Sequence, residues 1–193
     1  MRARLYAATE SSHVALDAKL VSLFDQGPDG YAEFLRMSAQ GVLTLERGLE
    51  AAGIAATLPD WALRARAASL LTDMTALGVA VPPMLDVRLP REEAYLYGVL
   101  YVLEMSRLGA KRLARRVEDM ADARIRAANR YLNHGEGMDL WQTFHERLEA
   151  SQAVRAAPDR AIKGALAAFA AFDPGLGSAP QPSSRPLPRL DRS

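Results

Sequence analysis

Apolar residues recur at helical spacing along most of the chain. Glycines and prolines interrupt this pattern: Gly53 and Gly78 each follow an apolar stretch, and the prolines between residues 79 and 90 forbid a helix interior. No alternating run bounded by hairpin turns is present, so the predicted class is all-α, a single-domain bundle of helices. The periodicity predicts helices over residues 3–25, 29–52, 60–77 and 91–116, a shorter helix that ends near residue 132, and helices over 139–152 and 158–172.

The stretch 91–116 is the centre of the predicted bundle. Its apolar run is too dense for a helix with one buried face, so most of it is expected to be buried. Gly98 and Gly109 lie inside it, and an interior glycine costs a helix roughly 1 kcal/mol relative to alanine. Two explanations remain at this point: tight packing against another helix, or a bend where a ligand approaches the backbone.

One domain is expected to span residues 1–172. The chain has 193 residues, 49% of them hydrophobic, which suffices for a substantial core. From residue 173 onward proline, serine and glycine dominate and the apolar periodicity stops. Residues 173–193 are therefore expected to form a flexible tail.

Composition excludes several classes of function. With 24 lysines and arginines against 23 acidic residues, the formal net charge is +1, so nucleic acid and anionic membranes are not expected partners. The N-terminal residues resemble no signal peptide, and no apolar run approaches the ~20 residues of a membrane span, so a cytoplasmic protein is expected. The absence of cysteine excludes disulfides, iron–sulfur clusters and a cysteine nucleophile. Phosphate-binding glycine loops, hydrolase elbows and helix-turn-helix patterns are also missing.

Three histidines and one basic run carry the candidate chemistry. His13, His134 and His145 have no spacing typical of a zinc site, but a single imidazole can hold a haem iron as its axial ligand. His13 lies in mid-helix, where it is either such a ligand or an ordinary helix histidine, and the other two are expected to be surface or structural residues. The basic run 111–116 is either a solvated helix face or a surface that attracts an acidic redox partner or a ligand carboxylate.

The order and spacing of several short motifs resemble the bacterial haem oxygenase family. The nearest branch is the one that makes bilin for bacterial phytochromes, and the resemblance covers about residues 5–172. The motifs are Ala8-Thr9-x3-His13-x3-Asp17, Tyr31-x2-Phe34-Leu35, Leu45-Glu46-x2-Leu49 with Ala52-Gly53, Leu71-x-Asp73-x3-Leu77-Gly78, Leu100-Tyr-Val-Leu-Glu-x-Ser-x-Leu-Gly109 and Trp141-x2-Phe144.

The resemblance implies that haem is both cofactor and substrate. Haem would lie between the helix that bears His13, the axial ligand of the iron, and the helix that bears Ser106 and Gly109. Oxygen and a reductant, such as ferredoxin or a reductase, would open the macrocycle to biliverdin, carbon monoxide and iron, and a bacteriophytochrome is a possible recipient. Ser106 with ordered water would supply the proton, and Gly109 would bring the backbone close to the oxygen. Tyr101 matches a position that contacts one haem propionate, and Lys163 or Arg160 is the candidate partner for the other.

Two positions depart from the family pattern. Tyr6 stands where relatives often place a lysine that binds a propionate, a role for which Arg2 or Arg4 is the candidate substitute, and the departure that matters most is Met105. Met105 stands where the first glycine of the distal helix is expected. Its sulfur could ligate the iron opposite His13, its side chain could fill the cavity and abolish haem binding, or the helix could shift and leave the chemistry intact. The alternative to an enzyme is therefore a non-catalytic haem-binding or sensory protein of the same fold, in which Met105 blocks the oxygen site. A helical domain without haem is the third possibility.

Overall fold

Helices account for the regular structure of residues 1–177, the part that the structure describes, and this part contains no strand. The computed structural model describes residues 1–177. The predicted all-α class is confirmed. The elements are α1 (Arg2–Phe24), α2 (Gly27–Ala52), α3 (Ile54–Thr57), α4 (Trp61–Arg64), α5 (Ala67–Leu77), α6 (Glu93–Glu118), α7 (Ala123–Ala127), α8 (Leu140–Ala150), α9 (Gln152–Ala156), α10 (Pro158–Phe172) and the 3₁₀ helix η1 (Pro174–Leu176).

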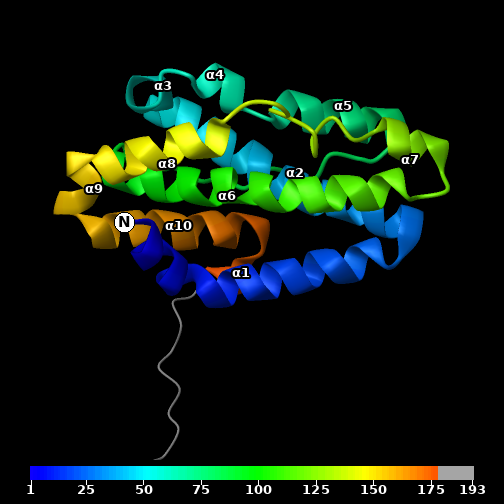
Figure 1. Ribbon diagram of the computed structural model, residues 1–193, viewed down its shortest axis with the longest axis horizontal. Coiled ribbons are helices and arrows are strands. Elements are labelled where there is room, and N and C mark those ends of the chain that lie inside the picture. The colour runs from blue at the N-terminus through cyan, green and yellow to red at the C-terminus, as the bar shows by residue number, and fades with distance from the viewer. Residues whose placement is uncertain (178–193) are drawn as a thin grey trace, which may run out of the picture.

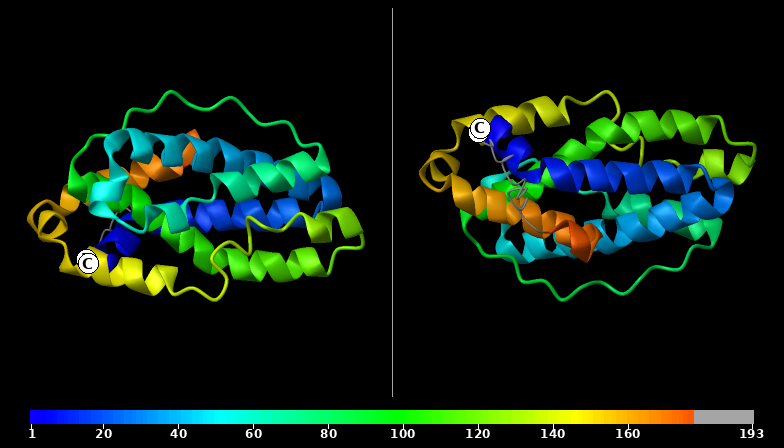
Figure 2. Two further views of the ribbon diagram at one scale, coloured as in Figure 1. Left: turned by 90° about the horizontal axis from the view of Figure 1, so that it is seen from above. Right: turned by 90° about the horizontal axis from the view of Figure 1, so that it is seen from below.

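Helix α6 runs through the middle of the bundle (Figure 1). It contacts α10 along its first half, and α10 in turn contacts α1 and α2. Helix α5 lies against α2, and α8 lies against α6. The proline-containing connection between α5 and α6 runs along the outside of the bundle (Figure 2).

The difference in helix length creates an opening between α1 and α6. Helix α10 has 15 residues, whereas α1 has 23 and α6 has 26, so α10 is shorter than either by roughly 12 Å or more. Figure 1 shows α10 ending partway along α1. Beyond its last turn, which carries Phe169 and Phe172, no helix separates α1 from the second half of α6 in residues 1–177.

The two glycines of the central helix have different environments. A Cβ atom on Gly98 would lie 1.9 Å from the carbonyl oxygen of Ala161, and one on Gly164 would lie 2.1 Å from that of Tyr95. These contacts bring the backbones of α6 and α10 together, so tight packing explains Gly98. A Cβ atom on Gly109 would meet nothing within 4 Å.

The predicted helix over residues 60–77 was wrong as a single element. It is divided into α4 and α5 at Ala65, which is extended (φ −61°, ψ 131°). The buried carboxylate of Glu46 causes the break, because it accepts hydrogen bonds from the backbone N–H groups of Arg66 (2.8 Å) and Ala67 (3.0 Å). A continuous helix would direct those groups to its own carbonyls instead.

Two more predicted helices differ in extent. The predicted helix over 139–152 ends two residues early, at Ala150, because Ser151 is extended and its hydroxyl caps α9 by accepting from the N–H of Val154. The helix expected to end near residue 132 is limited to α7, and turns follow it.

Residues 173–177 lie against α1. The Ser12 hydroxyl donates to the carbonyl of Leu176 at 2.6 Å, and Lys19 pairs with Asp173 at 2.8 Å. The rest of the predicted tail, residues 178–193, lies outside the described residues. In the described part of the chain, none of the helices combines the length and apolar character that a membrane crossing requires.

Alanine substitutions at Gly98 and Gly109, the two glycines of α6, should change the stability of the protein in opposite directions. Gly98→Ala should lower the free energy of unfolding by about 1–3 kcal/mol, because backbone atoms of α10 would have to move. Gly109→Ala should raise it by about 0.5–1 kcal/mol, because alanine favours the helix and meets no atom. Urea unfolding of both variants tests this, and a stable Gly98→Ala protein would contradict the tight crossing.

Candidate functional site

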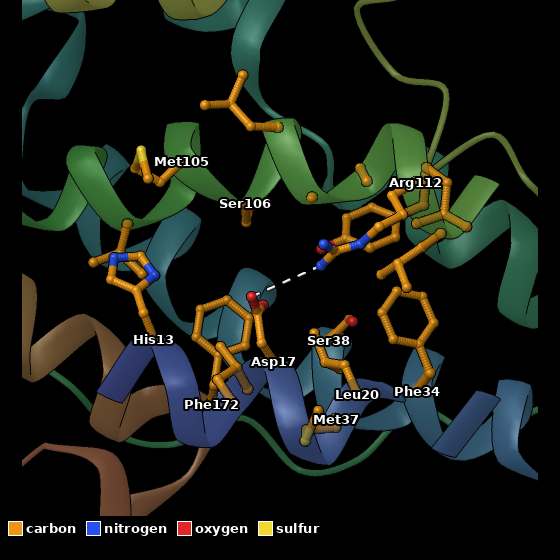
Figure 3. A pocket seen from close by; sticks show the side chains of 18 of the residues that line it. His13, Asp17, Leu20, Phe34, Met37, Ser38, Met105, Ser106, Arg112 and Phe172 are labelled. Atoms are coloured by element: carbon orange, nitrogen blue, oxygen red, sulfur yellow. Dashed lines mark ion pairs between the residues drawn. The ribbon is translucent and has the colours of Figure 1, made fainter. Parts of the chain in front are cut away.

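A cavity of about 480 Å³ lies between α1 and α6, beyond the end of α10 (Figure 3). Its volume is in the range of small-molecule and cofactor sites, about 300–1,000 Å³. Most of its walls are apolar, with a few polar groups directed inward. The lining residues include Leu16, Leu20 and Val21 of α1, Phe34 and Met37 of α2, Val102, Met105 and Leu113 of α6, and Phe169 and Phe172 of α10.

His13 projects from α1 toward α6 at one end of this cavity (Figure 3). The edge of its ring meets Phe169 with 4.7 Å between ring centroids, and Tyr101 lies behind it at 6.2 Å. Its Nε2 atom is buried and has no hydrogen-bond partner among the described residues. A buried polar atom without a partner is costly, so this nitrogen is suited to a ligand.

Burial lowers the pKa of His13 below its ordinary value of 6.5, although the charge of Asp17 opposes this effect. The ring is therefore neutral at pH 7, and a neutral imidazole is the form that ligates iron. The residues present fit a haem whose iron is held by Nε2.

Helix α6 forms the opposite wall, and the predicted site residues Met105, Ser106 and Gly109 lie on it. The Ser106 side chain is directed down into the cavity. The Met105 sulfur points away from His13 in this view (Figure 3). The Ser106 hydroxyl donates to the carbonyl of Leu103 at 2.7 Å. Gly109 leaves open space beside the helix.

Sequence reasoning did not identify Arg66, which also lines the cavity. Its Nη2 donates to the Ser106 hydroxyl at 2.8 Å and to the Leu103 carbonyl at 3.0 Å, and its guanidinium lies over the Tyr131 ring at 5.1 Å. The side chain is almost fully buried. No local pattern signals this role, because Arg66 reaches α6 only where the helix breaks between α4 and α5.

A buried network of charges supports α6 on the side away from the cavity. Glu104 pairs with Arg64 at 3.2 Å and with Arg107 at 2.9 Å, and Arg107 approaches the Nδ1 atom of His134 at 3.1 Å. Burial and the nearby Arg107 lower the pKa of His134 to about 4. His134 is thus a neutral structural residue, as the sequence predicts.

Two predicted propionate contacts do not lie on the cavity wall. Tyr101 is fully buried behind His13, and burial raises the pKa of its hydroxyl to about 12. Lys163 is exposed on α10, and Arg160 pairs with Glu92. In this geometry neither Lys163 nor Arg160 contributes to the cavity. His145 lies outside it as well, stacked on Trp141 with 6.0 Å between ring centroids.

Comparison with known proteins places these observations in a family. None of the protein-family models searched matches the chain. A protein named Heme oxygenase from Xanthomonas campestris pv. campestris (strain 8004) is 30% identical over 158 residues, which cover 80% of this chain and 93% of that protein. A match of this identity and extent shows that the chain belongs to the haem oxygenase family.

Proposed function

We propose that this protein is an enzyme that binds haem and opens it, with oxygen and a reductant, to biliverdin, carbon monoxide and iron. The observation that carries the proposal is the unpaired Nε2 atom of His13 at the wall of a 480 Å³ cavity. The name of the Xanthomonas relative supports the same activity. Bound haem would supply the iron at which oxygen is reduced and the porphyrin that is oxidised.

His13 would hold the iron from α1 and thereby place the ring within the cavity. Phe169 restricts the imidazole from one side and Tyr101 from behind, so its orientation is fixed before haem arrives. The lowered pKa of His13 keeps Nε2 available at neutral pH. The apolar side chains of the cavity would exclude bulk water from the reacting ring.

The roles of Ser106 and Arg66 follow from the direction of their hydrogen bonds. The Ser106 proton is committed to the Leu103 carbonyl, so Ser106 would act through its oxygen, which accepts from Arg66. The Arg66 side chain has five N–H donors, and its hydrogen bonds to other described residues use only Nη2. Arg66 would thus donate hydrogen bonds to ordered water in the cavity, and this water would carry the proton. Ser106 would position the Arg66 side chain by accepting its hydrogen bond.

Gly109 would contribute space. Gly109 itself carries no side chain, and a Cβ atom on it would meet nothing within 4 Å, so a small diatomic ligand would fit between the helix backbone and the ring at this residue. The electron donor would be a ferredoxin or a reductase, and a bacteriophytochrome would receive the product. The exposed basic residues Lys111 and Arg115 favour an acidic donor.

Met105 favours a second candidate function, a haem-binding protein without turnover. Its side chain lines the cavity on the wall that faces His13. Methionine is flexible, so a change of rotamer would bring its sulfur toward the iron. A six-coordinate centre of this kind would resist oxygen.

Reconstitution with haem separates enzyme from binder. Purified protein with haem, a reductant and oxygen should lose its Soret absorbance and release biliverdin and carbon monoxide. His13→Ala should weaken haem binding by at least about tenfold, because the axial ligand is removed. His145→Ala is the matched control, since this histidine lies outside the cavity, and it should behave like the unaltered protein. A stable Soret band without biliverdin would contradict the enzymatic proposal.

Replacing Met105 tests the second candidate directly. In the enzyme, Met105→Gly should leave the ferrous spectrum high-spin and change the rate of ring opening by less than about tenfold. In the non-catalytic binder, the unaltered protein should show a low-spin ferrous spectrum that the substitution abolishes. Absorption spectroscopy of the ferrous form without oxygen distinguishes the two.

Haem affinity should depend on pH through His13. Protonation of Nε2 removes the lone pair that binds iron, and burial places the pKa of His13 below 6.5. Affinity should therefore be highest at neutral and higher pH, where Nε2 is unprotonated, and fall as the pH drops through the lowered pKa. His13→Ala should lack this decline. A midpoint above 6.5 would contradict the assignment of His13.

A further inference from the structure

An ion pair joins the two walls of the cavity at its rim. Arg112 of α6 lies 3.8 Å from the carboxylate of Asp17 on α1 (Figure 3). Both residues line the cavity, and their side chains are 66% and 62% exposed. The distance exceeds that of a charge-assisted hydrogen bond, and exposed pairs are weak, so this contact is easily exchanged.

The charged side chains of the cavity differ in how firmly they are held. Among the described lining residues these are Asp17, Arg66 and Arg112. Arg66 is buried and bonded to Ser106, whereas Arg112 reaches only Asp17. Arg112 is therefore the cation of this wall that can turn to an incoming anion.

The neighbouring arginines of α6 have other surroundings. Arg116 pairs with Asp25 at 2.6 Å and lies over the Phe24 ring. Arg115 faces a separate hollow on the other side of α6. Arg112 is thus distinguished from arginines of the same helix by its position, although all three carry the same charge.

The position of the pair suits the edge of a porphyrin. Arg112 is seven residues, roughly 10 Å along the helix, from Met105, which stands opposite His13. Asp17 is four residues, roughly 6 Å, from His13. A ring centred at His13 would bring its periphery, where the two propionate carboxylates are attached, toward this rim.

We propose that Arg112 binds a propionate carboxylate of haem and that Asp17 is the ion-pair partner of Arg112 until haem binds. This inference rests on the proposed binding of haem and identifies how one edge of the ring is held. The planar guanidinium would donate hydrogen bonds to both oxygens of one carboxylate at once, a geometry that arginine favours. Asp17 carries the same charge as the propionate, so it competes with haem for Arg112 and repels it.

Haem and haem dimethyl ester together test the proposal, because the ester has the same ring and no carboxylate charge. Binding of each to the protein is followed by the Soret absorbance, without reductant. Arg112→Ala should weaken haem binding by about tenfold or more and leave ester binding unchanged. Asp17→Asn should strengthen haem binding relative to ester binding, since the competing charge is removed.

Arg115→Ala is the matched control, an arginine of the same helix that faces away from the cavity. It should leave the ratio of haem to ester affinity unchanged. Equal effects of Arg112→Ala and Arg115→Ala on haem would overturn the proposal, and so would equal losses of haem and ester in Arg112→Ala. Unaltered protein that binds no haem would overturn both this inference and the proposed function. Haem that binds with the expected selectivity but is never opened would contradict the enzymatic function alone.

Discussion

The close crossing of α6 and α10 determines where a ligand can enter this bundle. At Gly98 and Gly164 the helix backbones touch without intervening side chains, so α6 is held against α10 along its first half. Because α10 ends at Phe172 while α1 and α6 continue, the same contact that closes one half leaves the other open. The phenylalanines of the last turn of α10 form the end wall of the cavity, and His13 rests on one of them. The cavity thus exists because α10 is shorter than α1 and α6.

Buried charges fix which face of α6 meets the cavity. Glu104 is held by Arg64 and Arg107 on one side, while Ser106 is bonded to Arg66 on the other. Rotation of α6 would break both sets of contacts, and an unpaired buried charge costs several kcal/mol, on the order of 3–5. The rigidity of the cavity wall formed by α6 therefore depends on ion pairs outside the cavity as much as on the residues within it.

The sequence permits the helical class to be predicted from periodicity and the mid-helix position of His13 from motif order. For Gly109 it leaves both tight packing and the approach of a ligand open, and the structure alone shows the open space beside it. Arg66 could not be found in this way. Its place depends on the carboxylate of Glu46, distant in sequence, which breaks the expected helix. The same limit explains Lys163, because periodicity assigns it to α10 without revealing that it is exposed and does not line the cavity. Local sequence patterns reveal neither the polar contacts between residues distant in sequence nor which residues of a helix line a cavity.

Met105 need not conflict with a ring held by His13, because the cavity is asymmetric. It extends from His13 along α1 and α6 toward Arg112 and Phe34, away from the end where Met105 stands. A thioether at that end would narrow one part of the space between α6 and a bound ring, whereas Ser106 and Gly109 would leave the part farther along α6 open and polar. The bulk of Met105 would then favour one direction for a small ligand on the iron, toward the donors of Arg66. By obstructing one position for the small ligand, the Met105 side chain would select the position closer to Arg66.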